Sequence, residues 1–372
     1  MRFPEFSGEW KMCTIGELIT KVGSGVTPRG GEAVYKTEGH PFVRSQNVGL
    51  GNLLLDDIAF IDEETHLRQK NTELQFNDVL LNITGASIGR SALVDKQIVG
   101  GNVNQHVCII RTKENLVPSF ICSFLLSNYG QRQIDSFQAG GNRQGLNFEQ
   151  IKSIKITIPS KDEQIKIAKL LRAIDERIAT QNKIIDKLQS LIKGLRVCCM
   201  QRNGSNNVYL SEIAQIYQPQ TISSAELTED GFLVYGANGI IGKYKDYNHK
   251  TEQICITCRG NTCGMVNYTK PMSWITGNAM VINTDKYQDK VYKRYLYHFL
   301  SAYNFNSIIS GSGQPQIVRT PLEKLKITLP SISEQKQKAM ILDRIQDKID
   351  INHKVLNLYI RQKQYLLCQM FI

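Results

Sequence analysis

The hexapeptide PSKDEQ at residues 159–164 returns as PSISEQ at residues 330–335, an offset of 171 positions. The match extends upstream, where IKSIKITIPSKDEQ from Ile151 aligns with LEKLKITLPSISEQ from Leu322. In both copies apolar residues alternate with polar ones before the proline, which is the period of a short, half-buried strand. The chain therefore contains a repeated module, and this repeat indicates the domain organisation.

Each copy of the hexapeptide also predicts the start of a helix. Ser160 and Glu163, like Ser331 and Glu334, have the spacing of a capping box. In that motif the serine oxygen accepts a bond from an unpaired backbone amide, and the glutamate side chain reaches back to another amide. We therefore expect a helix to begin at each repeat.

Apolar residues then recur at alternating spacings of four and three over roughly 36 residues, which is the pattern of a heptad seam. The first seam contains Ile167, Leu171, Ile174, Ile178, Ile185, Leu188, Ile192 and Leu195. The second contains Leu342, Ile345, Ile349, Leu356, Tyr359, Leu366 and Met370, with polar breaks at Asn352 and Lys363. We expect the two helices to pack against each other as an antiparallel pair. The alternative is that each helix packs on its own domain.

Gln181 breaks the first seam at the register position that Asn352 has in the second, near the middle of each helix. In an antiparallel pair the midpoints meet, so we expect these amides to be hydrogen-bonded directly or through one water. A buried polar pair of this kind favours one register over slipped ones. The alternative is that both amides are exposed where the helix pair widens.

The repeat predicts an α+β fold with a pseudo-two-fold internal repeat, in which long antiparallel coiled-coil helices join two globular domains. The expected order is a domain at residues 1–159, a helix at 160–200, a domain at 201–330 and a helix at 331–372. The domains also match each other, more weakly than the helices. LLNITGASIGRSALV from Leu80 aligns with CITCRGNTCGMVNYT from Cys255, and FVRSQN from Phe42 aligns with LVYGAN from Leu233.

The composition is that of a soluble globular protein, with 41% hydrophobic and 21% charged residues in 372. Because no stretch resembles a signal peptide or a membrane-spanning helix, we expect a cytoplasmic protein without a membrane partner. The net charge of +11 favours an anionic partner such as nucleic acid. This excess lies outside residues 1–159, where acidic and basic residues balance.

The sequence lacks the motifs of catalysis. We find no Gly-x-Gly-x-x-Gly after a strand, no Asn/Asp-Pro-Pro-aromatic tetrapeptide and no P-loop. Cys255, Cys258 and Cys263 have no further nearby ligands to complete a zinc site. The adjacent carboxylates Asp56-Asp57 and Glu63-Glu64 are expected to be solvated surface charges. We therefore expect a non-enzymatic chain that binds no metal or cofactor itself.

Several motifs resemble those of the specificity subunits of type I restriction-modification enzymes. They are SGVTP at 24–28, DVLLNITGASIG at 78–89, NQHVCII at 104–110 and the duplicated strand-Pro-Ser-x-x-Glu-Gln-helix block. The resemblance covers essentially the full length and depends on the order and duplication of the motifs. The second domain departs from it, because YQPQTISSAEL at 217–227 lacks the Gly-x-x-Thr-Pro form.

The resemblance implies two target recognition domains, each reading one half of a split sequence in double-stranded DNA. It implies that the long helices dock two modification subunits, which carry S-adenosylmethionine and methylate adenine at N6. It also implies restriction subunits that use ATP and Mg. The chain itself would be non-catalytic.

Candidate DNA-binding residues are those that read base edges and lie in glycine-rich turns, where the backbone can approach the duplex. In the first domain they are Thr27, Arg29, Arg44, Ser45, Gln46, Asn47, Thr84, Ser87, Arg90, Asn104, Gln105, Arg143 and Gln144. In the second domain they are Tyr235, Asn238, Arg259, Asn261, Thr262, Asn278, Gln314 and Gln316, with Lys243 and Lys245 as phosphate contacts. For each residue the alternative is a turn residue that makes local hydrogen bonds. We expect His106 to be a strand-end histidine with its own partner.

Two other functions compete with this reading. A self-contained DNA methyltransferase or nuclease would need a cofactor motif that we do not find. A structural adaptor would use its helices to join proteins, and its globular domains would not bind DNA.

Overall fold

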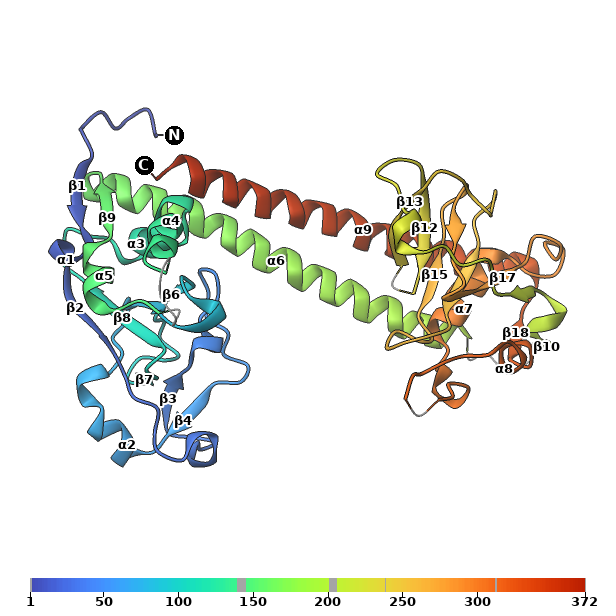
Figure 1. The fold of residues 1–372 in the computed structure, drawn as a ribbon, viewed down its shortest axis with the longest axis horizontal. Helices are drawn as coiled ribbons and strands as arrows, with labels where there is room; N and C mark the ends of the chain where they lie inside the picture. The colour runs from blue at the N-terminus through green and yellow to red at the C-terminus, as the bar shows by residue number, and fades with distance from the viewer. Residues whose placement is uncertain (1, 139–144, 201–205, 238, 312, 372) are drawn as a thin grey trace. The chain divides into compact units, whose positions relative to one another are not determined.

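The computed structural model describes residues 2–138, 145–200, 206–237, 239–311 and 313–371. The chain divides into two compact units, Met1–Asn182 with Lys354–Ile372 and Lys183–His353, which we call the first and second units. Each unit contains a globular part and a portion of two long helices, α6 (Lys161–Met200) and α9 (Ile332–Gln369) (Figure 1).

The globular part of the first unit contains three small sheets. Its elements are β1 (Lys11–Thr14), α1 (Ile15–Leu18), β2 (Ile19–Ser24), η1 (Gly31–Val34), β3 (His40–Val43), η2 (Ser45–Asn47), β4 (Ala59–Ile61), α2 (Glu63–Arg68), η3 (Lys70–Thr72), β5 (Val79–Asn82), η4 (Gly85–Ser87), β6 (Ser91–Leu93), β7 (Asn102–Val103), β8 (Val107–Thr112), α3 (Pro118–Leu126), α4 (Asn128–Ser136), α5 (Phe148–Ser153) and β9 (Lys155–Ile158). The sheets have the strand orders β2-β8-β5-β6, β4-β3-β7 and β1-β9. The β3–β7 pair is parallel and the others are antiparallel.

The second unit repeats this plan. Its elements are β10 (Asn206–Tyr209), η5 (Leu210–Glu212), β11 (Gln215–Tyr217), η6 (Ser224–Glu226), β12 (Phe232–Gly236), β13 (Gly239–Tyr244), β14 (Ile254–Thr257), β15 (Val266–Tyr268), β16 (Trp274–Ile275), β17 (Ala279–Asn283), α7 (Lys293–Ala302), η7 (Phe305–Ser307), α8 (Arg319–Glu323) and β18 (Lys326–Leu329). The strand orders β11-β17-β14-β15, β13-β12-β16 and β10-β18 match the first unit position by position, including the single parallel pair β12–β16. The internal repeat predicted from the hexapeptide is therefore confirmed.

The strand before each long helix is buried as the alternating pattern predicts. Ile156 in β9 and Ile327 in β18 are fully buried, and they lie opposite Cys13 and Val208 in the partner strands. The first strand of each globular part therefore pairs with its last strand, which closes the domain at the point where the helix begins.

The last residue of each hexapeptide is a buried glutamine that fastens the start of the long helix to the globular part. Gln164 Oε1 accepts a bond from the Val117 amide (2.9 Å), and Gln335 Oε1 accepts one from the Tyr292 amide (2.8 Å). Gln164 Nε2 donates to the Asn115 carbonyl, and Gln335 Nε2 donates to the Lys290 carbonyl, both at 3.1 Å. Because only an amide side chain can accept and donate in this way, the repeat preserves glutamine.

The two capping boxes differ. In α9 the Glu334 amide donates to Ser331 Oγ (3.3 Å), and the Ser331 amide donates to the Glu334 carboxylate (3.2 Å), as predicted. In α6 the Glu163 amide donates to Ser160 Oγ (3.4 Å), but the buried Glu163 carboxylate accepts two 2.8 Å bonds from the Arg2 guanidinium. The N-terminal segment thus takes part in the start of α6, which the capping pattern does not predict.

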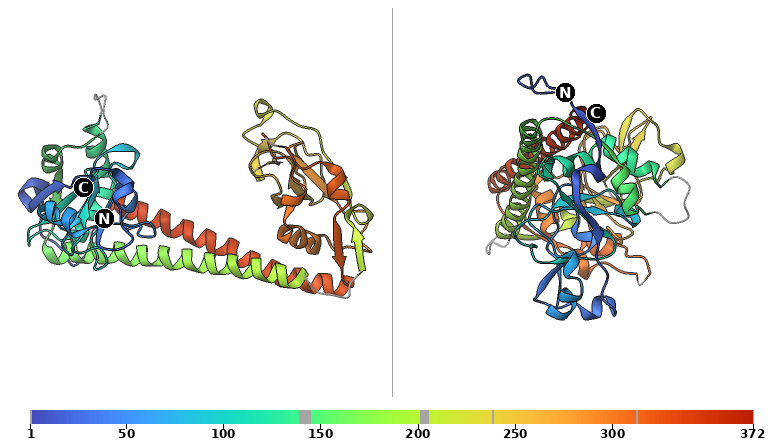
Figure 2. Two further views of the ribbon diagram at one scale, coloured as in Figure 1. Left: turned by 90° about the horizontal axis from the view of Figure 1, so that it is seen from below. Right: turned by 90° about the vertical axis from the view of Figure 1, so that its left-hand side faces the viewer.

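The two long helices pack against each other within each unit (Figure 2). In the first unit Leu171, near the start of α6, shares a core with Met370, near the end of α9, and with Phe120 of α3. In the second unit Ile192, near the end of α6, packs with Leu342 near the start of α9. The start of one helix meets the end of the other, so the pair is antiparallel. In the first unit the helix pair also packs against the globular part. The helices there contact both each other and their own domain, so each of the two arrangements considered from the sequence holds in part.

Gln181 and Asn352 fall in different units. Gln181 is buried, whereas Asn352 is partly exposed and its Nδ2 donates to the Lys348 carbonyl of its own helix (2.6 Å). Their pairing stays a prediction.

Candidate nucleic-acid interface

Four loops of the second unit meet around the glycine turn after β14. The Thr257 hydroxyl donates to the carbonyl of Ala237 in the β12–β13 turn. The Cys258 amide donates to the Asn278 carbonyl and the Ile317 amide to the Cys258 carbonyl, both at 3.0 Å. These bonds hold together the loops that carry the candidate residues Arg259, Asn261, Thr262, Asn278, Gln314 and Gln316.

Loops of the first unit meet in the same way around the turn after β5. Asn82 Nδ2 donates to the Ser45 carbonyl (2.8 Å). The Ile83 amide donates to the His106 carbonyl (3.0 Å), and the Leu146 amide donates to the Ile83 carbonyl (2.8 Å). These bonds bring together the loops that carry the candidates Ser45, Thr84, Ser87, Asn104 and Gln105.

The two turns share their backbone conformation. Gly85 and Gly89 have φ angles of +73° and +84°, and Gly260 and Gly264 have φ angles of +86° and +91°. A side chain is strained in this region, so these positions favour glycine. The weak sequence alignment of the two domains, which pairs these glycines, therefore reflects one turn built twice.

Several candidates in the first unit bond to one another. The Thr27 amide donates to Gln105 Oε1 (2.8 Å), and the Asn104 side chain accepts a bond from the His106 amide (3.0 Å). The His106 ring lies directly before β8 with Nδ1 2.5 Å from the Thr84 hydroxyl. His106 is therefore the partnered strand-end histidine that the sequence predicts, and it connects two of the candidate loops.

The run Arg44 to Asn47 is organised by Asp57. The Arg44 guanidinium donates to the Asp57 carbonyl (2.6 Å), and the side-chain Nδ2 of Asn47 donates to the Asp57 carboxylate (2.9 Å). The Gln46 side chain also donates to that carboxylate. Asn47 is fully buried, whereas Gln46 is exposed. Asp57 is solvent-accessible as expected, but its structural role has no signal in the sequence because its partners lie at least 10 residues away.

In the second unit Tyr235 is buried and its hydroxyl accepts a bond from the Lys270 amide (3.1 Å). Burial raises the pKa of Tyr235, which keeps the phenol neutral. Lys243 lies 3.3 Å from the Asp230 carboxylate, and Lys245 is exposed above the Tyr244 ring. Tyr235 thus supports the loop from inside, whereas both lysines reach solvent. The candidates Arg143, Gln144 and Asn238 lie outside the described residues.

Six arginines of the globular parts differ in their pairing. Arg44, Arg111 and Arg294 each form an ion pair with an aspartate. Arg29, Arg90 and Arg259 are exposed, and within the described part of the chain no carboxylate pairs with them. All three are candidate DNA-binding residues, and their guanidinium groups are available to an external anion or base.

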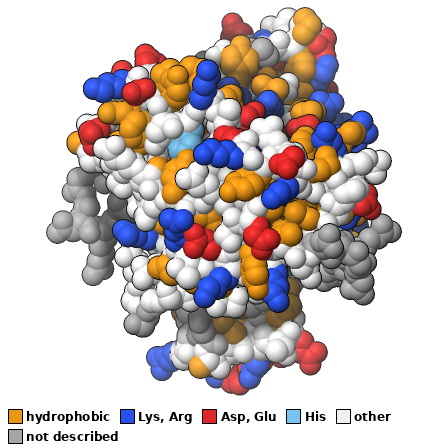
Figure 3. All heavy atoms as spheres, turned by 90° about the vertical axis from the view of Figure 1, so that its right-hand side faces the viewer, with side chains coloured by type: hydrophobic (Ala, Val, Ile, Leu, Met, Phe, Trp, Pro, Cys, Tyr) orange, Lys and Arg blue, Asp and Glu red, His pale blue; other side chains and the backbone are white. Residues whose placement is uncertain are grey.

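The charge distribution itself does not locate the interface. On the face of the second unit that Figure 3 shows, Lys and Arg side chains alternate with Asp, Glu and hydrophobic ones. This face is therefore not a uniformly positive surface. The convergence of loops that carry exposed hydrogen-bond donors is what indicates an interface.

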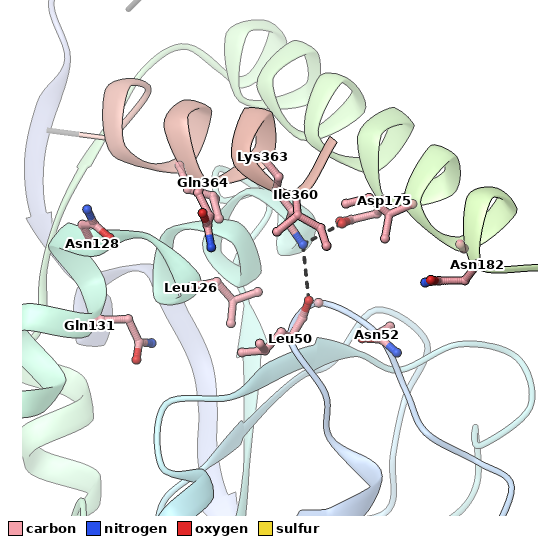
Figure 4. A pocket seen from close by; sticks show the side chains of 14 residues that line it. Leu50, Asn52, Leu126, Asn128, Gln131, Asp175, Asn182, Ile360, Lys363 and Gln364 are labelled. Atoms are coloured by element: carbon pink, nitrogen blue, oxygen red, sulfur yellow. Dashed lines mark hydrogen bonds and ion pairs between the residues drawn. The ribbon is translucent and has the colours of Figure 1, made fainter. Parts of the chain in front are cut away.

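A pocket of about 610 Å³ lies in the first unit between the loop at Leu50, the end of α3, and the two long helices (Figure 4). Lys363 projects into it and pairs with Asp175 of α6 (2.6 Å) while donating to the Leu50 carbonyl (3.3 Å). The polar break that Lys363 makes in the second seam therefore joins α9 to α6 and to the globular part. With its cation neutralised, the pocket presents chiefly apolar and amide side chains.

Burial decides the state of Cys255 and Cys258 in the second unit. It raises the pKa of Cys255 to about 12 and also raises the pKa of Cys258, so both stay protonated thiols. Among the described residues no group of three His, Cys, Asp or Glu side chains could hold a metal ion. None of the described helices combines the length and the apolar character that crossing a membrane requires.

Comparison with known families decides the identity. The family model described as "Type I restriction modification DNA specificity domain" matches residues 7–190 and again residues 203–358. The chain belongs to this family. The family supplies the non-catalytic specificity component of type I restriction-modification enzymes, which assembles with modification and restriction subunits. The resemblance stated from the motifs is thus confirmed, and so is the expectation of a non-enzymatic chain.

Relatives match over nearly the full chain. A putative type I restriction enzyme specificity subunit, MjaX of Methanocaldococcus jannaschii, is 23% identical and covers 94% of this chain and 90% of its own length. The MjaVIII specificity subunit of the same organism is 25% identical, over 95% of this chain and 89% of its own. The EcoprrI specificity subunit of Escherichia coli is 32% identical over 36% of this chain and 34% of its own.

Solved structures show the same fold. The S subunit of a type I restriction-modification system from M. genitalium superposes with a TM-score of 0.67 and 17% identity, covering 100% of this chain and 97% of that one. A chain from a study of complex assembly and conformational transition of the type I R-M system gives a TM-score of 0.58 and 15% identity, covering 98% and 97%.

Proposed function

We propose that the chain reads a bipartite sequence in double-stranded DNA, with residues 1–159 recognising one half-site and residues 201–330 the other. The observation that carries this proposal is the duplicated loop scaffold. The same positive-φ glycine turn gathers exposed polar loops once in each unit.

The residues in contact with bases are side chains of these loops that reach solvent. In the first domain they are the exposed Arg29, Gln46, Arg90 and Gln105 and the partly exposed Thr27 and Ser87, of which Thr27, Gln46, Ser87 and Gln105 also bond within the unit. In the second they are Arg259, Asn261, Thr262, Asn278, Gln314 and Gln316, with Lys243 and Lys245 on phosphates. Of the other candidates, Arg44, Asn47, Thr84, Asn104 and Tyr235 hold the loops in shape.

The outer faces of the long helices hold two modification subunits, one for each copy of the repeat. Large apolar side chains remain exposed on α6 and α9 although each helix already buries a seam. In the second unit they are Ile184, Leu191, Val197, Met340, Ile341 and Ile351. Exposed apolar surface of this kind is typical of protein–protein contact sites. S-adenosylmethionine and adenine N6 methylation belong to those subunits, and ATP and Mg to the restriction subunits.

A domain exchange tests the proposal. Residues 1–159 are replaced by the corresponding segment of a relative, and N6-methyladenine is mapped in DNA from cells that express the chain with its modification subunits. We expect one half of the methylated sequence to change while the other half and the spacer stay the same. A change in both halves would show that the domains do not read independently. The same map with the gene deleted is the control.

A further inference from the structure

Three segments of the second unit pair through two isolated β-bridges beside the Gly260 turn. Gln316 and Ser310 exchange two backbone hydrogen bonds of 2.8 Å. Gln316 also lies opposite Arg259 on the other side. The backbone of Gln316 is therefore the middle of three paired segments, and Arg259, Gln316 and Ser310 stand in one lateral row.

Arg259 and Gln316 form a non-hydrogen-bonded antiparallel pair, in which the two backbones lie close together. The Gly260 amide donates to the Pro315 carbonyl and the Ile317 amide to the Cys258 carbonyl, both at 3.0 Å. These bonds flank Arg259 and do not involve it, so Arg259 faces its partner as a non-hydrogen-bonded pair. In such a pair the Cα atoms are about 4.5 Å apart, and the two side chains project from the same face.

Burial shows which face this is. Cys258 and Ile317, the neighbours of Arg259 and Gln316, are only 2% and 3% exposed. Because side chains alternate between the faces of a sheet, the row of Arg259, Gln316 and Ser310 points to solvent, and all three residues are exposed. Within the described residues neither the Arg259 guanidinium nor the Gln316 side-chain amide has a hydrogen-bond partner.

We propose that this row reads two adjacent base pairs of the second half-site in the major groove. Arg259 binds guanine O6 and N7, and Gln316 binds adenine N6 and N7. These are the bidentate pairings that the two side chains favour. The separation of about 4.5 Å at the Cα atoms suits neighbouring bases, which are about 3.4 Å apart along each strand. This inference rests on the proposed function and adds to it the bases recognised.

The first unit has the same scaffold without the same side chains. Thr84 occupies the aligned position of Arg259, and it lies opposite Gly145. Its hydroxyl is already bonded to the His106 ring. The guanine–adenine reading therefore belongs to the second half-site only, and the first domain must recognise its bases with other residues.

The test selects binding sites from a random duplex pool, using the full chain assembled with its modification subunits. The variants are Arg259→Ala, Arg259→Lys and Gln316→Ala, and Lys286→Ala is the control because it removes an exposed charge elsewhere in the unit. We expect Arg259→Ala to reduce guanine discrimination at one base pair of one half-site by roughly 10- to 100-fold. Gln316→Ala should weaken the preference for adenine at the neighbouring position. Lys286→Ala should change neither base preference.

Arg259→Lys separates base reading from phosphate binding. A lysine keeps the charge but loses the two-pronged geometry, so guanine discrimination should fall with this variant too. The inference is overturned if both Arg259 variants keep every base preference and only lower affinity, or if the affected positions are not adjacent. If the wild-type chain selects no bipartite sequence, the proposed function itself fails. Thermal unfolding of each variant verifies that the fold is intact.

Discussion

At the residue scale, the repeated glutamine explains why the hexapeptide occurs twice. A helix start alone needs only the capping residues, which tolerate several side chains. The side chains of Gln164 and Gln335 each accept a bond from the backbone amide just before α3 or α7. Each also donates to two carbonyls, one in that segment and one of the proline that opens the hexapeptide. The same local requirement in both units therefore preserves the same residue.

We predict that Gln335→Ala lowers the free energy of unfolding of the second unit by about 1–3 kcal/mol, because it leaves the partly buried Tyr292 amide without an acceptor. Hydrogen exchange gives a local measurement, since the Tyr292 amide should lose protection. Gln337→Ala, an exposed position on the same helix, is the matched control and should change stability by less than about 0.5 kcal/mol. Unchanged protection at Tyr292 would contradict the assigned role.

A second residue-scale feature is a polar cluster around the buried His298, which joins α7 to both long helices in the second unit. His298 Nε2 donates to Asp343 of α9 (2.7 Å), and His298 Nδ1 accepts from Arg196 of α6 (3.2 Å). Arg294 also binds Asp343 (2.9 Å). Burial lowers the pKa of His298 although its bond to Asp343 opposes that shift. The ring is neutral in this arrangement, because Nδ1 must accept a hydrogen bond.

We predict that stability falls as the pH drops below about 6.5, the histidine pKa of an unfolded chain. The unfolded state then binds a proton that the folded His298 resists, so acidification favours unfolding. His249, whose pKa is also lowered by burial, contributes with the same sign. Urea unfolding between pH 7.5 and 5 measures how steeply the free energy of unfolding changes with pH. His298→Asn should reduce this pH dependence, and replacement of the exposed His353 should not. An equal slope in both variants would remove His298 from the explanation.

The sequence predicts the parts of the candidate site that depend on local geometry. Positive-φ glycines can be recognised because few other residues tolerate that conformation, so Gly85 and Gly260 identify the turns. Pairings across long separations cannot be recognised in this way. Asp57 bonding to Arg44 and Gln316 facing Arg259 depend on how the loops fold together. The sequence therefore places the candidates in these loops, whereas their division into exposed and buried groups required the structure, and their contact with DNA stays a prediction.

At the scale of elements, each long helix has a buried apolar seam and further apolar side chains that remain exposed. The heptad pattern predicts the buried seam because its spacing is regular. The exposed apolar residues follow no such period, and they were not recognised in the sequence. Leu191 and Ile192 illustrate the difference, since they are neighbours on α6 and are 49% and 4% exposed.

We predict that Ile192→Ala destabilises the second unit by about 2–5 kcal/mol, because it creates a cavity beside Leu342 in the helix seam. Leu191→Ala should leave unfolding almost unchanged and instead weaken assembly with the modification subunit. Urea unfolding and titration of the purified subunits measure the two effects separately. If Leu191→Ala binds the partner with unchanged affinity, this part of the exposed face is not a docking surface.

At the scale of the whole molecule, a bipartite target requires a defined spacing between the half-sites. Each domain must meet the groove at its own position along a duplex that turns about once in 10 base pairs. α6 and α9 run continuously through both units, so their register bears on the spacer. Gln181 and Asn352 are the polar positions near the middle of these helices.

We predict that replacing both Gln181 and Asn352 with leucine raises the unfolding temperature and weakens discrimination between spacers that differ by one base pair. The buried Gln181 amide costs stability, but a slipped register would leave it unpaired at about 1–3 kcal/mol, a penalty that leucine does not impose. Binding to duplexes with a series of spacer lengths measures the discrimination, and calorimetry measures the stability. Leucine at the exposed positions Gln189 and Asn357 of the same helices is the control and should leave spacer preference unchanged. A double variant that is less stable, or that discriminates spacers as sharply as the natural chain, would show that these amides do not set the register.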